Sequence, residues 1–231
     1  MALGTIGRFD IDMNLSFLQS LGIGGPKQVA SRKWSNRALI SEADVNLFTW
    51  ERTVDEAIPQ YLQTKLQDPP ETINASISTK SLPAAIENAR NAWDGGHLAT
   101  ADAFWQDVAQ LAHDFLDFSP RKSGKLHLKV VSDNACSKFH MDWYHLRLFT
   151  TYHGKGTEWI PEEAVDRSAL GQTNKEIVKD QRKVQQLETV DVGILKGAHS
   201  ESKRPIKGIV HRSPEIEREG EKRVILRIDL A

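Results

Sequence analysis

The sequence predicts an α+β fold in which helices precede strands. Apolar residues recur at helical spacing in three segments before residue 120, whereas from residue 125 onward they alternate with polar residues. This order favours an α+β fold or a helix-flanked β-barrel over alternating βαβ units. We therefore expect an irregular lead-in over residues 1–40 and a single domain over residues 41–231, mainly helical to residue 120 and mainly β from residue 125.

Two of the expected helices are marked by their ends. Thr53 and Glu56 form a capping-box signature, and Pro59 should bend or divide the helix that follows them. The next helix is expected to start at Ser81, with a proline in its first turn, and to stop at Gly95.

The third helix has the clearest pattern. Its apolar residues recur at i, i+4, i+7, i+11 and i+14, which predicts one buried face made of Phe104, Val108, Leu111, Phe115 and Phe118. Asp102 or Thr100 is expected to cap its start, and Ser119-Pro120 should end it.

Period-two alternation predicts strands in the second half of the chain. The segments with this pattern are "KLHLKVV", "KFHMDW", "HLRLFTTY", "VDVGILKG", "IKGIVH" and "KRVILRIDL". A polar and partly helix-prone insert over residues 161–188 interrupts them, and it would serve as a lid or as a surface excursion.

Composition argues against several classes of partner. Thirty basic residues against 31 acidic ones leave no net charge to attract nucleic acid or anionic lipid. No apolar run approaches the roughly 20 residues that cross a bilayer, and the N-terminus does not resemble a secretory signal. With a single cysteine no internal disulfide can form, so we expect a cytoplasmic protein that binds neither nucleic acid nor membranes.

His140 and Asp142 are the first candidate metal ligands. On a strand, residues i and i+2 leave the same face with Cα atoms roughly 6.5 Å apart, so both side chains can reach one ion. Chance alone predicts roughly 0.5 such pairs in this composition, a typical false-positive risk for a short motif. The alternative is a polar pair at a strand end that hydrogen-bonds the backbone.

The C-terminal region supplies possible companions for this pair. His211 ends one expected strand, and twelve residues later Arg223 opens the last strand. In that strand Val224, Leu226, Ile228 and Leu230 form an apolar face, while Arg223, Ile225, Arg227 and Asp229 form the opposite, mostly charged face. The charged face must look into water or into a polar cavity.

A His-x-Asp pair, a distant histidine and an arginine about a dozen residues later resembles the residue order of Fe(II)/2-oxoglutarate-dependent oxygenases. The resemblance implies a double-stranded β-helix (a jelly-roll or cupin-like core) in the C-terminal half, backed by helices from the N-terminal half. It also implies Fe(II) bound by His140, Asp142 and His211. Arg223 would anchor the far carboxylate of 2-oxoglutarate through paired charge-assisted hydrogen bonds.

The sequence departs from the oxygenase pattern at one position. Many such enzymes carry a hydroxyl two residues after the arginine, whereas this chain has Ile225. Tyr152 or Thr151 would then have to provide the hydroxyl, or 2-oxoglutarate is not the co-substrate.

The strings "NLFTWER", "FHMDWYHLRLFTTYHGKGTEW" and "GIVHRSP" resemble a bacterial family of unknown function, from about Asp44 to Leu230. Genes of that family often lie near zinc-responsive genes. This resemblance implies an alternative, a non-catalytic zinc-binding or zinc-handling protein in which Cys136 is a further candidate ligand. A metal-free interaction domain is the third hypothesis. The substrate, whether a small molecule or a protein, is not identified by the sequence.

Overall fold

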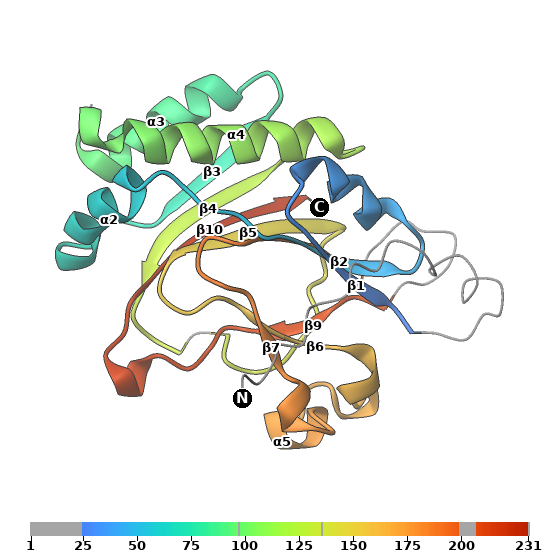
Figure 1. Ribbon diagram of the computed structural model, residues 1–231. Helices are drawn as coiled ribbons and strands as arrows, with labels where there is room; N and C mark the ends of the chain where they lie inside the picture. Colours follow the sequence, from blue (N-terminus) through green and yellow to red (C-terminus); the bar gives the residue numbers. More distant parts are fainter. Residues whose placement is uncertain (1–24, 97, 135, 199–206, 231) are drawn as a thin grey trace, which may run out of the picture.

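A computed structural model of the chain describes residues 25–230, except for residues 97, 135 and 199–206. These residues form two β-sheets (Figure 1). The strand order of the large sheet is β1-β2-β8-β5-β10-β4-β3, and that of the small sheet is β7-β6-β9. All neighbours in both sheets are antiparallel except β1 and β2.

The strands of the large sheet are β1 Lys27–Ser31, β2 Val45–Trp50, β3 Ile73–Ser78, β4 Ser123–Val131, β5 Leu146–His153, β8 Val192–Lys196 and β10 Arg223–Leu230. Those of the small sheet are β6 Glu158–Ile160, β7 Gln185–Gln186 and β9 Val210–Arg212. The α-helices are α2 Ala57–Gln67, α3 Leu82–Asp94, α4 Asp102–Phe118 and α5 Asn174–Ile177, and a 3-10 helix spans Trp34–Ser41.

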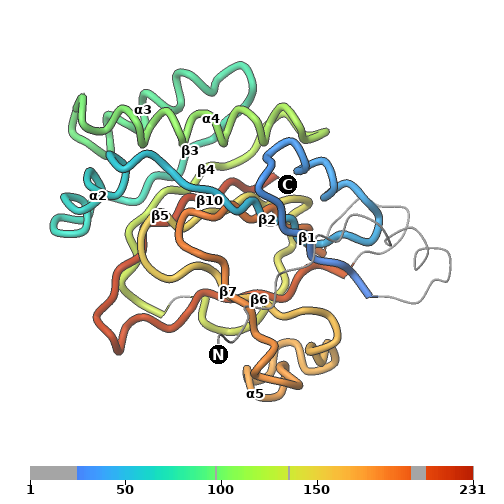
Figure 2. The backbone as a smooth tube through the Cα atoms, viewed as in Figure 1, coloured from blue at the N-terminus to red at the C-terminus, as the bar shows by residue number. Residues whose placement is uncertain are grey.

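The elements form three layers. Helices α3 and α4 cover one face of the large sheet, and the small sheet lies on its other side (Figure 1). Figure 2 shows the chain crossing between the two sheets. Among the described residues, no helix combines the length and apolar character needed to cross a membrane.

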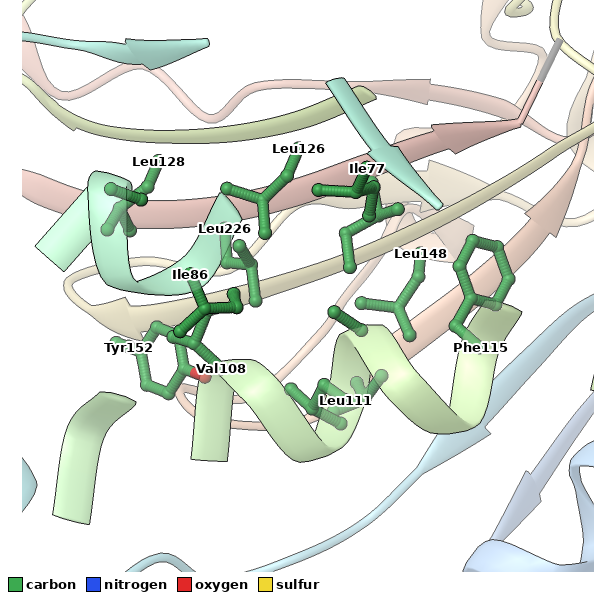
Figure 3. Packing of buried hydrophobic residues seen from close by; sticks show 14 of the residues in the cluster. Ile77, Ile86, Val108, Leu111, Phe115, Leu126, Leu128, Leu148, Tyr152 and Leu226 are labelled. Carbon is green, nitrogen blue, oxygen red and sulfur yellow. The ribbon is translucent and has the colours of Figure 1, made fainter. Parts of the chain in front are cut away.

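Helix α4 confirms the expected stripe. Phe104, Val108, Leu111 and Phe115 are at most 2 % exposed, and Phe118 packs against the same cluster. Figure 3 shows three of these residues pointing toward the strands of the large sheet. Burying an aliphatic or aromatic side chain of this size contributes about 1.5–3 kcal/mol, so this stripe holds the helical layer to the sheet. The expected caps are absent, because Asp102 is already the first helical residue and no side chain caps the start.

Helix α3 begins and ends as expected, whereas α2 does not. Gly95 closes α3 in the left-handed conformation that glycine adopts without strain. Helix α2 starts at Ala57 without the expected capping box, since Asp55 Oδ1 accepts the Ala57 N–H at 2.8 Å instead. Pro59 therefore falls in the first turn, where its missing N–H has no helical partner to lose, and it does not divide the helix.

The alternation along the strands is confirmed and has a direct structural consequence. Leu126 and Leu128 of β4, Leu148 of β5, and Leu226 and Ile228 of β10 are fully buried in the core against the helices. The residues between them point to the opposite face, toward the small sheet, because successive side chains leave opposite faces of a sheet. The polar face expected for the last strand thus faces the interior between the two sheets.

Several segments differ from expectation. Strand β1 lies in the part of the chain expected to be an irregular lead-in, and β2 and β3 lie in the part expected to be mainly helical. "KFHMDW" is not a strand, because only His140 pairs, through an isolated bridge to His211. The segment leaves the sheet after that bridge.

The polar insert packs behind the small sheet. Ile177 of α5 is fully buried in a second apolar cluster that includes Phe139 and Val210. Asn174 accepts the Phe139 N–H at 2.8 Å and donates to the Ser137 carbonyl at 2.9 Å. The insert therefore fixes the residues that immediately precede His140 and His211.

Candidate metal and co-substrate site

The structure brings His140, Asp142 and His211 together on the inner side of the small sheet. The backbones of the two histidines exchange a pair of N–H to carbonyl hydrogen bonds, each 3.0 Å long, which sets the rings side by side with centroids 4.7 Å apart. The Asp142 carboxylate lies 3.2 Å from Nε2 of His211 and 3.7 Å from Nε2 of His140. One ligand atom of each residue lies within 4.8 Å of the others, close enough for a shared ion.

Backbone contacts orient both rings. Nδ1 of His140 lies 2.8 Å from the Lys138 carbonyl oxygen, and Nδ1 of His211 lies 3.2 Å from the Ile209 carbonyl oxygen. Donation from Nδ1 to these carbonyls leaves the Nε2 lone pairs directed at the centre of the trio. Histidines that bind metals commonly donate their other ring N–H to a backbone carbonyl in this way.

The electrostatics of the trio also suit a cation. Burial lowers the pKa of His140, with the neighbouring His211 adding to the effect, which keeps its ring neutral. Burial alone would raise the pKa of Asp142, but the neighbouring His211, Arg147 and His140 lower it to about 2. Asp142 therefore stays ionised.

Arg147 links Asp142 to the large sheet. Its Nη1 donates to Asp142 Oδ2, and its Nε donates to Asp229 Oδ1 at 2.5 Å. All three side chains are less than 10 % exposed. Arg147 thus holds the aspartate in place although residues 141–145 form no regular element. No sequence pattern had pointed to Arg147, because one of its partners is 82 residues away along the chain.

Arg223 is a buried cation that lines the same cavity. It is 1 % exposed, its Nε donates to the Lys155 carbonyl at 2.6 Å, and its Nη2 donates to Thr151 Oγ1 at 3.2 Å. In the described part of the chain no carboxylate forms an ion pair with it. Burial lowers the pKa of Arg223 to about 10, which still leaves it charged at neutral pH.

The two hydroxyl candidates lie on opposite faces of β5. Thr151 is beside Arg223, as the sequence allowed. Tyr152 is on the helix side, where its hydroxyl donates to Asp107 at 2.5 Å within the core, so the expectation for Tyr152 is corrected. Adjacent strand residues point to opposite faces, and only one of the two can reach Arg223.

Cys136 does not join the trio. It is exposed, and its backbone adopts a left-handed conformation with φ 61°. Among the described residues, the group whose ligand atoms converge consists of the two histidines and the aspartate alone. Cys136 lines the mouth of the cavity without completing a zinc-like ligand set.

One cavity of about 290 Å³ is lined by both histidines of the trio, by Arg147, which holds Asp142, and by Arg223. Besides the residues already described, the side chains on its sheet side include Asn74, His127, Lys129, Val131, Phe149, Ile225 and Arg227. Alternation on β4 and β10 predicted that their polar residues share a face, but not that this face closes a cavity. A larger recess of about 1020 Å³ lies between β2 and β7, and none of the trio lines it.

Comparison with known proteins identifies the family and the fold of the chain. Residues 34–229 match the model of a family described as a protein of unknown function, DUF1826. No curated protein sequence matches the chain.

Dioxygenase for auxin oxidation 1 from Arabidopsis thaliana, solved as a complex with 2-oxoglutarate, aligns with a TM-score of 0.55 and 9 % identity over 90 % of this chain and 92 % of that chain. The corresponding rice dioxygenase aligns with a TM-score of 0.47 and 9 % identity over 80 % of this chain and 73 % of that chain. The first likeness confirms the expected double-stranded β-helix, with helices backing its major sheet.

Proposed function

We propose that this chain, which belongs to the DUF1826 family of proteins of unknown function, is a mononuclear non-haem Fe(II) oxygenase that uses 2-oxoglutarate as co-substrate. Its fold is that of a structure solved with 2-oxoglutarate bound. Likeness of fold does not carry activity, so the proposal depends on the residues of the cavity.

The ligand set fits Fe(II). His140 and His211 supply two imidazole nitrogens and Asp142 one carboxylate oxygen, the combination found in non-haem oxygenases. Bound there, Fe(II) would activate dioxygen while keeping a place for the co-substrate. The chain's own part is to hold the three ligands, which it does through the bridge between the histidines and through Arg147.

The position of Arg223 is the observation that most supports the use of 2-oxoglutarate. A guanidinium is desolvated in the same cavity as the two histidines, and among the described residues no carboxylate is in ion-pair contact with it, Glu158 acting on it only from a distance. Leaving a buried charge unpaired costs several kcal/mol, and an incoming carboxylate removes that cost through two charge-assisted hydrogen bonds. Thr151, which accepts from Arg223, can donate its hydroxyl proton to the same carboxylate.

The test starts from full-length protein purified without added metal, whose bound metal is measured. Fe(II) and then 2-oxoglutarate are titrated anaerobically, and the visible absorption of the chelate reports binding. Arg223→Gln should lose the 2-oxoglutarate response and keep the metal, whereas His211→Ala should lose the metal.

Tyr152→Phe is the matched control, because it alters the neighbouring residue on the other face of β5. Its titration should match that of the wild type. Tightly bound zinc with no response to 2-oxoglutarate would contradict the proposal and favour the zinc-binding alternative.

A further inference from the structure

The cavity wall carries more positive charge than the metal and its co-substrate account for. Five cationic side chains line it: Lys129, Arg147, Arg212, Arg223 and Arg227. Three buried or half-buried carboxylates pair with them: Asp142, Asp229 and Glu158. Glu215, which is 3.7 Å from Arg212 and 57 % exposed, is largely screened by solvent. Two positive charges are left over.

Loading the site does not change this balance. A divalent ion adds two positive charges, and the two carboxylates of 2-oxoglutarate remove two. The excess of two positive charges therefore remains in the loaded site, and it favours an anionic group on whatever else enters the cavity.

We propose that the substrate carries an anionic group, a carboxylate or a phosphate, and that Lys129 and Arg227 bind it. This inference rests on the proposed function, since it names the substrate class of the same site. Both residues lie on the inner face of the large sheet and line the cavity beside the trio.

The register of the strands brings the two cations within reach of one anion. Lys129 of β4 is opposite Ile225 of β10, and Arg227 lies two residues further along β10 on the same face. Such diagonal neighbours are about 7–8 Å apart at their Cα atoms, a distance that long side chains can close. Their ends can therefore converge on a single carboxylate or phosphate.

Neither cation is satisfied by the protein. Lys129 is half-buried and makes no ion pair among the described residues. Nε of Arg227 lies 3.0 Å from Asp229 Oδ2, but the geometry is not that of a hydrogen bond, and both atoms are buried without a hydrogen-bond partner in the described structure. Asp229 is already bonded to Arg147, so it compensates Arg227 only in part.

The neighbouring strand adds hydrogen-bonding groups to the same flank. His127 is opposite Arg227 on β4, and its Nδ1 lies 2.6 Å from Oδ1 of Asn74 on the edge strand β3. This flank of the cavity is thus polar and cationic across three adjacent strands. Arg223 lies four residues from Arg227 along β10, a separation of roughly 13 Å at about 3.3 Å per residue. Lys129 is a diagonal neighbour of both arginines, so Arg227 is the residue that distinguishes this anion site from that of Arg223.

Sulfate is a suitable probe, because it is a dianion and a weak ligand for iron. It is titrated calorimetrically into full-length protein, under anaerobic conditions, with and without saturating Fe(II) and 2-oxoglutarate. Arg227→Gln and Lys129→Gln should each weaken its binding about 10- to 100-fold, as expected when a hydrogen bond to a charged group is lost. Arg227→Lys, which keeps the charge, should retain most of the affinity, and this separates a binding role from a structural one.

Lys125→Gln is the matched control. It removes the same charge from the same strand at an exposed position outside the cavity, and it should leave sulfate binding unchanged. Three results would each overturn the inference. The first is unaltered sulfate binding in both the Arg227 and Lys129 variants, and the second is loss of sulfate binding in Arg223→Gln alone. The third is the absence of saturable sulfate binding in the wild type. Failure of 2-oxoglutarate to bind, with sulfate behaving as expected, would instead overturn the proposed function.

Discussion

Replacing Arg147 by methionine should destabilise the protein by about 3 kcal/mol. Its guanidinium lies between Asp142 and Asp229, and the three side chains are 9 %, 8 % and 2 % exposed, so solvent screens their charges little. Removing one partner of a buried ion pair costs about 3–5 kcal/mol. The lower end applies here, because Asp142 keeps His211 at 3.2 Å and Asp229 keeps Arg227 at 3.0 Å.

Urea denaturation at pH 7 measures this cost, with Arg147→Met, Asp229→Asn and the double variant forming a thermodynamic cycle. The double variant should be less destabilised than the sum of the single variants, with a coupling of about 1–3 kcal/mol, since neutralising Asp229 removes the charge that Arg147 compensates. Arg182→Met is the control. That residue also pairs with an aspartate but is 89 % exposed, and its replacement should change the stability by no more than about 0.5 kcal/mol.

A loss below about 1 kcal/mol in Arg147→Met, or a coupling indistinguishable from zero, would refute this reasoning. Either result would mean that water reaches the three side chains and screens them. The bridge could then no longer explain how Asp142 is held in an irregular segment.

Three further predictions concern other residues. Thr151→Val should weaken 2-oxoglutarate binding about tenfold in the anaerobic titration, because a hydrogen bond is lost. Adding Ile225→Ser should restore part of the lost affinity. No restoration would show that a hydroxyl on β10 cannot replace that of Thr151. Gly154→Ala should cost at least about 2 kcal/mol in urea denaturation, because φ is +81° and a Cβ there would clash with the backbone carbonyl oxygen of Lys222. An unchanged midpoint would contradict the described turn. Burial lowers the pKa of Lys196 to about 8, so the folded chain binds fewer protons than the unfolded chain between about pH 8 and 10. Stability relative to Lys196→Met should therefore rise by about 2 kcal/mol across that window, and a flat or falling difference would exclude the shift.

The elements that the sequence predicted well are those in which one face is strongly apolar. Helix α4 and strand β10 each bury a complete stripe, and a stripe has the same period in the sequence as in the fold. Strand β3 was not predicted, because "INASIS" buries only Ile73 and Ile77, and its remaining residues are small or polar. β3 is a strand because it pairs with its neighbour in the large sheet, and not because of its own composition.

The candidate trio was predicted for a reason that is only half right. His140 and Asp142 were expected on a regular strand, where residues i and i+2 share a face. The chain instead leaves the sheet after His140, and Asp142 reaches the same place because His211 and Arg147 contact it from other elements. Contacts between residues far apart in the sequence leave no local pattern, and for this reason Arg147 was not foreseen.

The departure at Ile225 has a similar explanation. Fe(II)/2-oxoglutarate-dependent oxygenases often carry a hydroxyl two residues after the arginine, on the same strand. In this chain Ile225 is opposite Thr151 on the adjacent strand β5, and both residues face the cavity side. Opposite residues of an antiparallel pair have Cβ atoms about 4.5–5.5 Å apart, so moving a hydroxyl across the pair shifts it by roughly one side chain. The hydrogen bond from Arg223 to Thr151 shows that the shifted hydroxyl still reaches the guanidinium, and the sequence departure therefore does not argue against a carboxylate at this site.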